Sequence, residues 1–317
     1  MCETVNRSQP FRINRIQLAG HIFVNICLIP IYLFFALLAV LLALSPLFPA
    51  RTARANLRTQ FASDFFQTFY GTAAVLFHYF LIIIEDFVFW PLGILLIRDN
   101  PTAHSMLNAA SARAKENSRG LAVLSAHFGN IEVTADALNA TLVPLVSEDT
   151  PVMALAKPSS FPWATNLLSW YRKLRRIDVI WTNRKDLARA IIQNLRSGRA
   201  LALLIDQKPS SAGHFQNFFN SPAAFPEGGV EIALRAQVEF VCIASRRLFP
   251  GVYTFEASEI RFSDEPLKMQ DVIQAYALWL ESVIRMSPWQ WCWDYRKWSR
   301  KPQKSTLKTP APASDTH

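Results

Sequence analysis

One segment near the N-terminus restricts the fold more than any other feature of the chain. Residues 16–50 contain no lysine, arginine, aspartate or glutamate and are mostly apolar. The segment is longer than the roughly 20 apolar residues that a helix needs to span a bilayer, and longer than the apolar core of a cleavable signal peptide. We therefore predict a retained membrane anchor over residues 1–50. Arginines flank it equally on both sides, which leaves open a single spanning helix and a re-entrant helical hairpin.

Composition excludes several classes of protein for the remainder of the chain. Of 317 residues, 51% are hydrophobic and only 18% are charged, which excludes a disordered protein and a small disulfide scaffold. The net charge of +9 suits anionic lipid, an acidic carrier or nucleic acid. The four cysteines are far apart and form no CxxC pair, so we predict no disulfide framework and no metal site. No dinucleotide, nucleotide or zinc-protease motif occurs, and we expect no cofactor.

A second apolar region, residues 77–97, contains Glu85, Asp86 and Pro91. Carboxylates are costly in hydrocarbon unless they are paired or face protein. We therefore predict an interfacial or buried helix here, within an amphipathic helical region over residues 51–118. A core helix of the following domain is an equally good interpretation.

From residue 119 to residue 300, short apolar runs alternate with amphipathic stretches, as in βαβ units around a parallel sheet. The predicted fold class is therefore α/β, an αβα sandwich with a mostly parallel central sheet. The expected strands are residues 120–124, 152–156, 179–181, 200–205 and 240–244. The expected helices include residues 184–197, closed by Gly198, and residues 267–286. Residues 301–317 have few large apolar side chains, and we predict a disordered tail.

The sequence after the first of these strands is the best candidate for chemistry. His127 leaves the strand, a Gly-Asn turn follows, and a helix is expected to begin near Asn130 with Glu132 in its first turn. A carboxylate at Glu132 could accept the imidazole Nδ1 hydrogen and leave Nε2 free as a general base. A simple helix-capping role for these residues is the alternative. A competing Asp206–His214 pair also stays open.

At these residues the chain resembles a known family. The segment AHFGNIE behind an apolar anchor is similar to the H-x4-[DE] motif of the bacterial late acyltransferases of lipid A biosynthesis, within the lysophospholipid acyltransferase superfamily. Further blocks agree in order: ANLRTQF, LAKPSSFP, the run from RKDLARAI through LLIDQKP to FFNSPA, and the closing PWQWCWDYRKW. Three positions depart from the family pattern, with Lys157 in place of arginine, Asn220 in place of glycine and Tyr295 in place of histidine.

The resemblance implies a role for each matching residue. His127 would be the base that deprotonates an acceptor hydroxyl, and Glu132 would orient it. Backbone amides of Phe128, Gly129 and Asn130 would stabilise the oxyanion. The substrate cleft would be completed by a second group of side chains, namely Lys157, Asp206, Gln207 and Arg246.

The resemblance implies a membrane-bound O-acyltransferase that moves a fatty acyl chain from acyl carrier protein or acyl-CoA to a hydroxyl of a lipid A precursor. It would lie in the bacterial inner membrane with its catalytic domain facing the cytoplasm, and its acceptor would be an anionic glycolipid. Transfer to another glycolipid or to a lysophospholipid, a thioesterase and a non-catalytic lipid-binding protein are the alternatives. The alternating tryptophans at 289–298 suggest an edge strand or a membrane-interface belt rather than a nucleic-acid surface.

Overall fold

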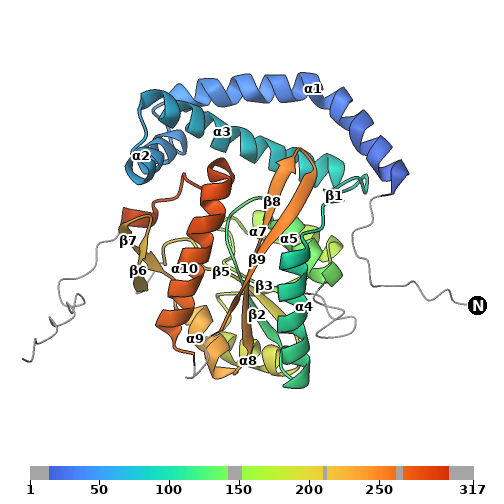
Figure 1. The fold of residues 1–317 in the computed structure, drawn as a ribbon, viewed down its shortest axis with the longest axis vertical. Helices are drawn as coiled ribbons and strands as arrows, with labels where there is room; N and C mark the ends of the chain where they lie inside the picture. Colours follow the sequence, from blue (N-terminus) through green and yellow to red (C-terminus); the bar gives the residue numbers. More distant parts are fainter. Residues whose placement is uncertain (1–13, 142–151, 210–212, 262–266, 300–317) are drawn as a thin grey trace, which may run out of the picture.

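The computed structural model describes residues 14–141, 152–209, 213–261 and 267–299. Within them a layer of apolar helices covers one end of an α/β domain, which confirms the expected fold class (Figure 1). The helices are α1 (Arg15–Leu44), α2 (Ala50–Phe61), α3 (Phe65–Ile84), the π-helix η1 (Glu85–Phe89), α4 (Pro101–Glu116), α5 (Ile131–Thr141), α7 (Pro162–Leu174), α8 (Leu187–Arg196), α9 (Gly228–Arg235), α10 (Met269–Met286) and the 3-10 turns η2 (Pro288–Gln290) and η3 (Lys297–Ser299). The predicted tail at 301–317 lies outside the described residues.

The central sheet is mostly parallel. Its strand order is β1-β9-β8-β2-β5-β3-β4, and β8 with β9 is the antiparallel pair among the described strands of this sheet. The strands are β1 (Leu96–Ile97), β2 (Leu121–Ser125), β3 (Val152–Ala156), β4 (Ile177–Trp181), β5 (Ala200–Leu204), β8 (Glu239–Phe249) and β9 (Val252–Ile260). The fully buried, apolar β2 lies between β5 and β8, where both of its faces are covered.

Alternate residues of β2 belong to two different cores. Ala122 and Leu124 pack with α8, α9 and α10, whereas Leu121 and Val123 pack with α4 and α5. This division is the layered αβα arrangement that the sequence predicts. The predicted helix at 184–197 is α8, and Gly198 follows it with a φ of 85°.

Two strand pairs were missed by sequence patterning. Strand β8 continues well past residue 244 and turns back into β9, and a separate hairpin joins β6 (His214–Phe218) to β7 (Ser221–Phe225). The hairpin turn is Phe219-Asn220, with φ values of 51° and 58°. Two-residue hairpin turns favour positive φ, and a glycine in the turn is the usual sign of them in a sequence. Asn tolerates this region, which explains how it can occupy a position where the family pattern has glycine.

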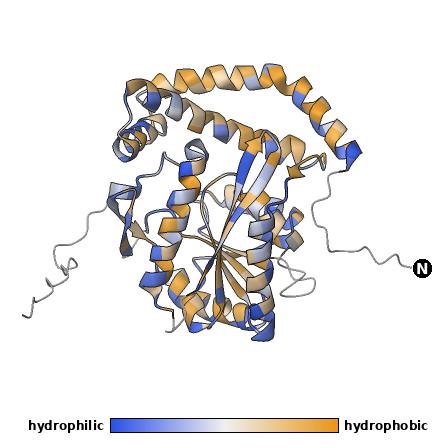
Figure 2. Cartoon of the chain, in the orientation of Figure 1, coloured by the Kyte–Doolittle hydropathy of each residue, from blue (hydrophilic) through white to orange (hydrophobic). Residues whose placement is uncertain are grey.

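Helices α1 and α3 are both long and apolar enough to cross a membrane. They run antiparallel, with α2 at the turn, and together cover the end of the sheet toward which β8 points (Figure 1). Only 11% of the most apolar window of α1 is buried, against 56% for α3 with η1. Figure 2 shows α1 as an almost uniformly hydrophobic helix. The N-terminal segment is thus an exposed apolar helix lying on a half-buried one.

The two carboxylates of the second apolar region are buried and paired, in the way that the sequence required. Glu85 receives Arg247 at 2.6 and 2.5 Å, together with the Gly251 backbone N–H at 2.9 Å. Asp86 accepts from Arg175 at 3.0 Å. Both arginines belong to the α/β domain, so these ion pairs fix α3 and η1 to it.

Candidate functional site

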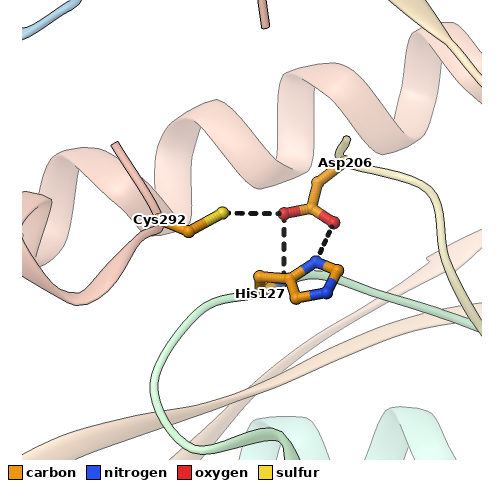
Figure 3. A group of neighbouring side chains, drawn as sticks. All are labelled: His127, Asp206 and Cys292. Atoms are coloured by element: carbon orange, nitrogen blue, oxygen red, sulfur yellow. Dashed lines mark hydrogen bonds and ion pairs between the residues drawn. The ribbon is translucent and has the colours of Figure 1, made fainter. Parts of the chain in front are cut away.

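His127 lies just beyond the carboxyl end of β2 and is held by one carboxylate. Its Nδ1 is 2.9 Å from Oδ1 of Asp206, and its backbone N–H donates to Oδ2 of the same residue at 2.9 Å (Figure 3). Two contacts from one side chain fix both the position and the rotation of the imidazole. Because Nδ1 is occupied, Nε2 is the nitrogen left to act on a substrate.

Asp206 is fully buried and well supplied with donors. Besides His127, the Trp291 indole donates to Oδ2 at 3.0 Å, and the Cys292 thiol lies 3.8 Å from the same oxygen. Burial raises the pKa of Asp206, but the adjacent His127 and these hydrogen bonds outweigh it, so the pKa is lowered. Burial lowers the pKa of His127, but the charge and hydrogen bond of Asp206 outweigh it, so that pKa is raised.

The pairing of His127 with Asp206 follows from strand order. Strands β2 and β5 are parallel neighbours, with Ser125 opposite Leu204. The residues that follow the two strands therefore emerge side by side at the carboxyl edge, where open α/β sheets bind ligands. Both strands were predicted, but their adjacency was not, since β3 and β4 separate them in sequence.

Glu132 makes a different contact from the one expected. Its Oε1 accepts from Arg172 of α7, from Nε at 3.1 Å and from Nη2 at 3.0 Å. The carboxylate on Nδ1 of His127 is Asp206, not Glu132. The first turn of α5 directs Glu132 toward α7, whereas the end of β5 brings Asp206 behind the imidazole. His127 and Glu132 nevertheless line one cavity.

That cavity has a volume of about 300 Å³. It lies between the carboxyl edge of the sheet and α3, and its lining is mostly apolar apart from a few polar groups. The lining residues are His78, Tyr79, Ile82, Asp86, His127, Gly129, Asn130, Ile131, Glu132 and Cys292. A site of this kind, under an apolar helix, suits a substrate with both an acyl chain and a polar head.

The Gly-Asn turn shapes the cavity, but its amides are engaged elsewhere. Gly129 has a φ of +64°, and a Cβ there would lie 1.8 Å from the Ser245 carbonyl oxygen. Its N–H donates to the Gln290 carbonyl, and that of Asn130 donates to Ser245 Oγ. These two N–H groups are therefore not directed at a substrate oxyanion. Phe128 is buried and forms a β-bridge with Trp291.

Asn130 instead organises the start of α5. Its Oδ1 accepts from the Glu132 and Val133 amides at 3.0 and 3.3 Å, as an N-cap does. Its Nδ2 donates to Asp86 at 3.0 Å. One side chain thus links the turn after His127, the helix that carries Glu132 and the π-helix η1.

The closing tryptophan block forms neither an edge strand nor a membrane belt. Trp291 and Trp293 are buried in the main core, and only Trp289 of the alternating series is largely exposed. The Cys292 amide donates to the His127 carbonyl at 3.2 Å. Asn56 of α2 donates to the carbonyls of Trp293 and Tyr295. The block therefore holds the His127 loop, which the alternating pattern did not indicate because its hydrogen bonds are long-range.

The other predicted cleft residues lie outside the cavity lining. Lys157 is exposed, and Arg246 pairs with Glu256 at 2.8 Å. Gln207 hydrogen-bonds through its side chain with Cys292, which lines the cavity. His214 begins β6 opposite Phe225, and Asp206 bonds to His127, which replaces the alternative Asp206–His214 pair.

His127, Asp206 and Cys292 also form a candidate metal-ligand group that sequence spacing did not predict. One ligand atom from each lies within 4.8 Å of the others (Figure 3). Both Asp206 oxygens already accept hydrogen bonds, and burial raises the pKa of the Cys292 thiol well above its usual range. A thiol ligand must lose its proton, so these donors suit a hydrogen-bonded pair better than a metal site.

Comparison with known proteins identifies one matching family. The sequence profile described as "Bacterial lipid A biosynthesis acyltransferase" matches residues 109–300, from within α4 to the end of the tryptophan block. No curated protein matches the chain. The matched range contains His127, Asp206, Glu132 and Arg172.

Proposed function

The chain belongs to the bacterial lipid A biosynthesis acyltransferase family, and from this we propose that it transfers a fatty acyl chain from a thioester to a hydroxyl of a lipid A precursor. The observation that carries the proposal is His127, fixed by Asp206, at the edge of a cavity beneath apolar helices. This arrangement supplies a base and an apolar site, and the family supplies the reaction class.

In the proposed reaction, Nε2 of His127 removes the proton of the acceptor hydroxyl. The oxygen attacks the thioester carbonyl carbon and the C–S bond breaks. The leaving thiolate then takes the proton from His127, so that an ester and a free thiol are formed. Asp206 stabilises the transient imidazolium and keeps Nδ1 protonated, as a triad carboxylate does.

We assign Glu132 a supporting role in this reaction. Glu132 lines the cavity together with His127 and binds Arg172 of α7. An arginine held by one carboxylate keeps further donors for an anionic group. The pair would orient the phosphorylated head of the acceptor relative to His127.

We propose acyl carrier protein or acyl-CoA as the donor, and the inner membrane, with the catalytic domain at the cytoplasmic side, as the location. The exposed apolar surface of α1 and the net charge of +9 support attachment to an anionic membrane. An acidic carrier protein would be attracted by the same charge.

The test is acyl transfer by the full-length protein in vesicles. Acyl carrier protein loaded with a series of chain lengths is mixed with a lipid A precursor, and mass spectrometry measures acylated product and free fatty acid. We expect His127→Ala to lower the transfer rate about 10²–10⁴-fold. The matched control is His104→Ala on α4, whose residue pairs with Asp99 and lies outside the cavity lining. Equal rates for the two variants, or free fatty acid as the main wild-type product, would contradict the proposal.

A further inference from the structure

Helix α7 presents an apolar face that the fold does not cover. The helix has no buried residue along its length. Its large apolar residues recur at spacings of four, three and four, which places them on one side of a helix. They are Trp163, Leu167, Trp170 and Leu174, each between 52% and 67% exposed, and Phe161 precedes them at 63%.

The opposite face of α7 attaches to the protein by charge. Arg172 binds Glu132, and Arg175 binds Asp86 at 3.0 Å and Asp136 at 2.5 Å. The Arg175 guanidinium also lies over the Trp90 ring at 4.7 Å. Because these contacts fix the helix, its apolar face is not needed to hold it in place.

The charges on α7 favour an anionic partner. Residues 162–174 contain no aspartate or glutamate, and the last turn carries Arg172 and Lys173, with Arg176 just beyond it. An apolar face with tryptophans and flanking cations is the pattern of a helix that lies at the surface of an anionic bilayer.

Helix α7 also lies against exposed apolar residues in and after η1. Tyr171 lies against the rings of Phe87 and Trp90 in and just after η1, with centroid distances of 6.0 and 5.8 Å. Phe87 and Leu92 are 70% and 58% exposed. Exposed apolar residues of η1 and of the turn after it therefore lie beside α7.

We propose that α7 is a second membrane-contacting element, whose apolar face enters the headgroup boundary of an anionic bilayer and brings Arg172, with the cavity residue Glu132 that it binds, next to the lipid surface. The acceptor lipid would reach the site from that surface. The inference rests on the proposed function, in which the protein is membrane-bound and acylates a lipid.

Brominated lipids test the contact directly, since bromine on an acyl chain quenches tryptophan fluorescence at short range. The full-length protein is placed in phosphatidylethanolamine and phosphatidylglycerol vesicles, with and without brominated chains. We expect the bromine-quenched signal to fall by about half in the double variant Trp163→Phe/Trp170→Phe. Trp279→Phe on α10, which packs on the opposite face of the sheet, should leave it unchanged.

A kinetic measurement tests the consequence for the reaction. Trp163→Asp/Leu167→Asp places two charges in the apolar face and changes no residue of the cavity lining. We expect the KM for acceptor in anionic vesicles to rise about 10-fold while kcat stays the same, and no change for acceptor dispersed in detergent. Leu278→Asp, at an equally exposed position on α10, is the matched control and should behave as wild type.

The outcomes separate this inference from the proposed function. Wild-type protein that transfers no acyl chain in either medium overturns the proposed function. Normal transfer with no loss of quenching in the α7 variant overturns only the membrane contact of α7. A change confined to the KM for acyl carrier protein, or to self-association, would also overturn it, because the face would then bind protein.

Discussion

Asp206 and Glu132 are two carboxylates close to one cavity, and the fold holds them in different ways. Asp206 is fully buried at the end of β5 and receives His127 and the Trp291 indole. Glu132 lines the cavity and receives Arg172 from α7, a helix with no buried residue. The buried Asp206 determines which imidazole nitrogen of His127 is free, whereas Glu132 connects the cavity to a helix at the surface. Motif spacing alone does not distinguish these roles.

The largest effect expected from this comparison is that of Asp206→Asn. The amide cannot stabilise the imidazolium and can hold the wrong tautomer, so kcat should fall about 10²–10⁴-fold. The raised pKa of His127 places the acidic limb of the wild-type pH profile above the ordinary histidine value, because only the neutral ring acts as a base. Removing the carboxylate charge lowers that pKa and moves the limb to lower pH. The pH dependence of kcat/KM measures the position of the acidic limb in the wild type and in Asp206→Asn. An acidic limb at the same pH in both would mean that a group other than Asp206 raises the pKa of His127.

A smaller effect is expected from the Glu132–Arg172 pair. Glu132→Gln should lower kcat/KM about 10- to 100-fold, because Arg172 is left without its carboxylate partner, with the acidic limb close to that of the wild type. A double-mutant cycle with Arg172→Met tests whether the two act as a unit. In that case the double variant is no slower than Glu132→Gln. Fully additive losses of kcat/KM in the double variant would contradict this prediction. A shift of the acidic limb in Glu132→Gln as large as that in Asp206→Asn would also contradict it, because the two carboxylates would then have the same role.

The smallest effect on the reaction is expected from Lys297, a buried lysine close enough to Asp206 to be influenced by its charge. Lys297 donates to the Ala224 carbonyl at 2.7 Å, and burial lowers its pKa to about 7. Between about pH 7 and pH 10 the unfolded chain binds the proton more strongly, so this residue makes the folded state more stable as the pH rises. The stability of Lys297→Met relative to wild type should therefore fall over this range, by on the order of 3 kcal/mol. Thermal unfolding in detergent at several pH values measures it, and a constant difference would mean that Lys297 keeps an ordinary pKa.

The two long apolar segments show how far hydropathy can predict their environment. Both α1 and α3 are apolar enough to span a membrane, but α3 leads into Glu85 and Asp86. The sequence indicated that these carboxylates needed partners. It could not name Arg247 and Arg175, which are more than 85 residues away in the chain. Pairing across such separations depends on how the sheet and its helices are stacked.

Local pattern and spacing were enough to predict the α/β class, helix α8 with its closing Gly198, and the position of His127 after a buried strand. These features depend on residues close together in sequence, where side-chain periodicity and backbone preference act directly. The blocks shared with the acyltransferase family could also be recognised in the sequence, and the family profile matches residues 109–300, a range that contains all of them except ANLRTQF.

Only the tertiary structure decided which carboxylate holds His127 and what the tryptophan block does. Asp206 reaches the imidazole because β5 inserts beside β2, and Trp291 reaches Asp206 because α10 returns the chain end to the same edge of the sheet. The tertiary structure likewise decided that the apolar residues of α7 are exposed, because the other side of this segment is bound to Asp86, Glu132 and Asp136. Strand order and helix stacking are set by the total burial of many distant side chains, and no local segment encodes that sum.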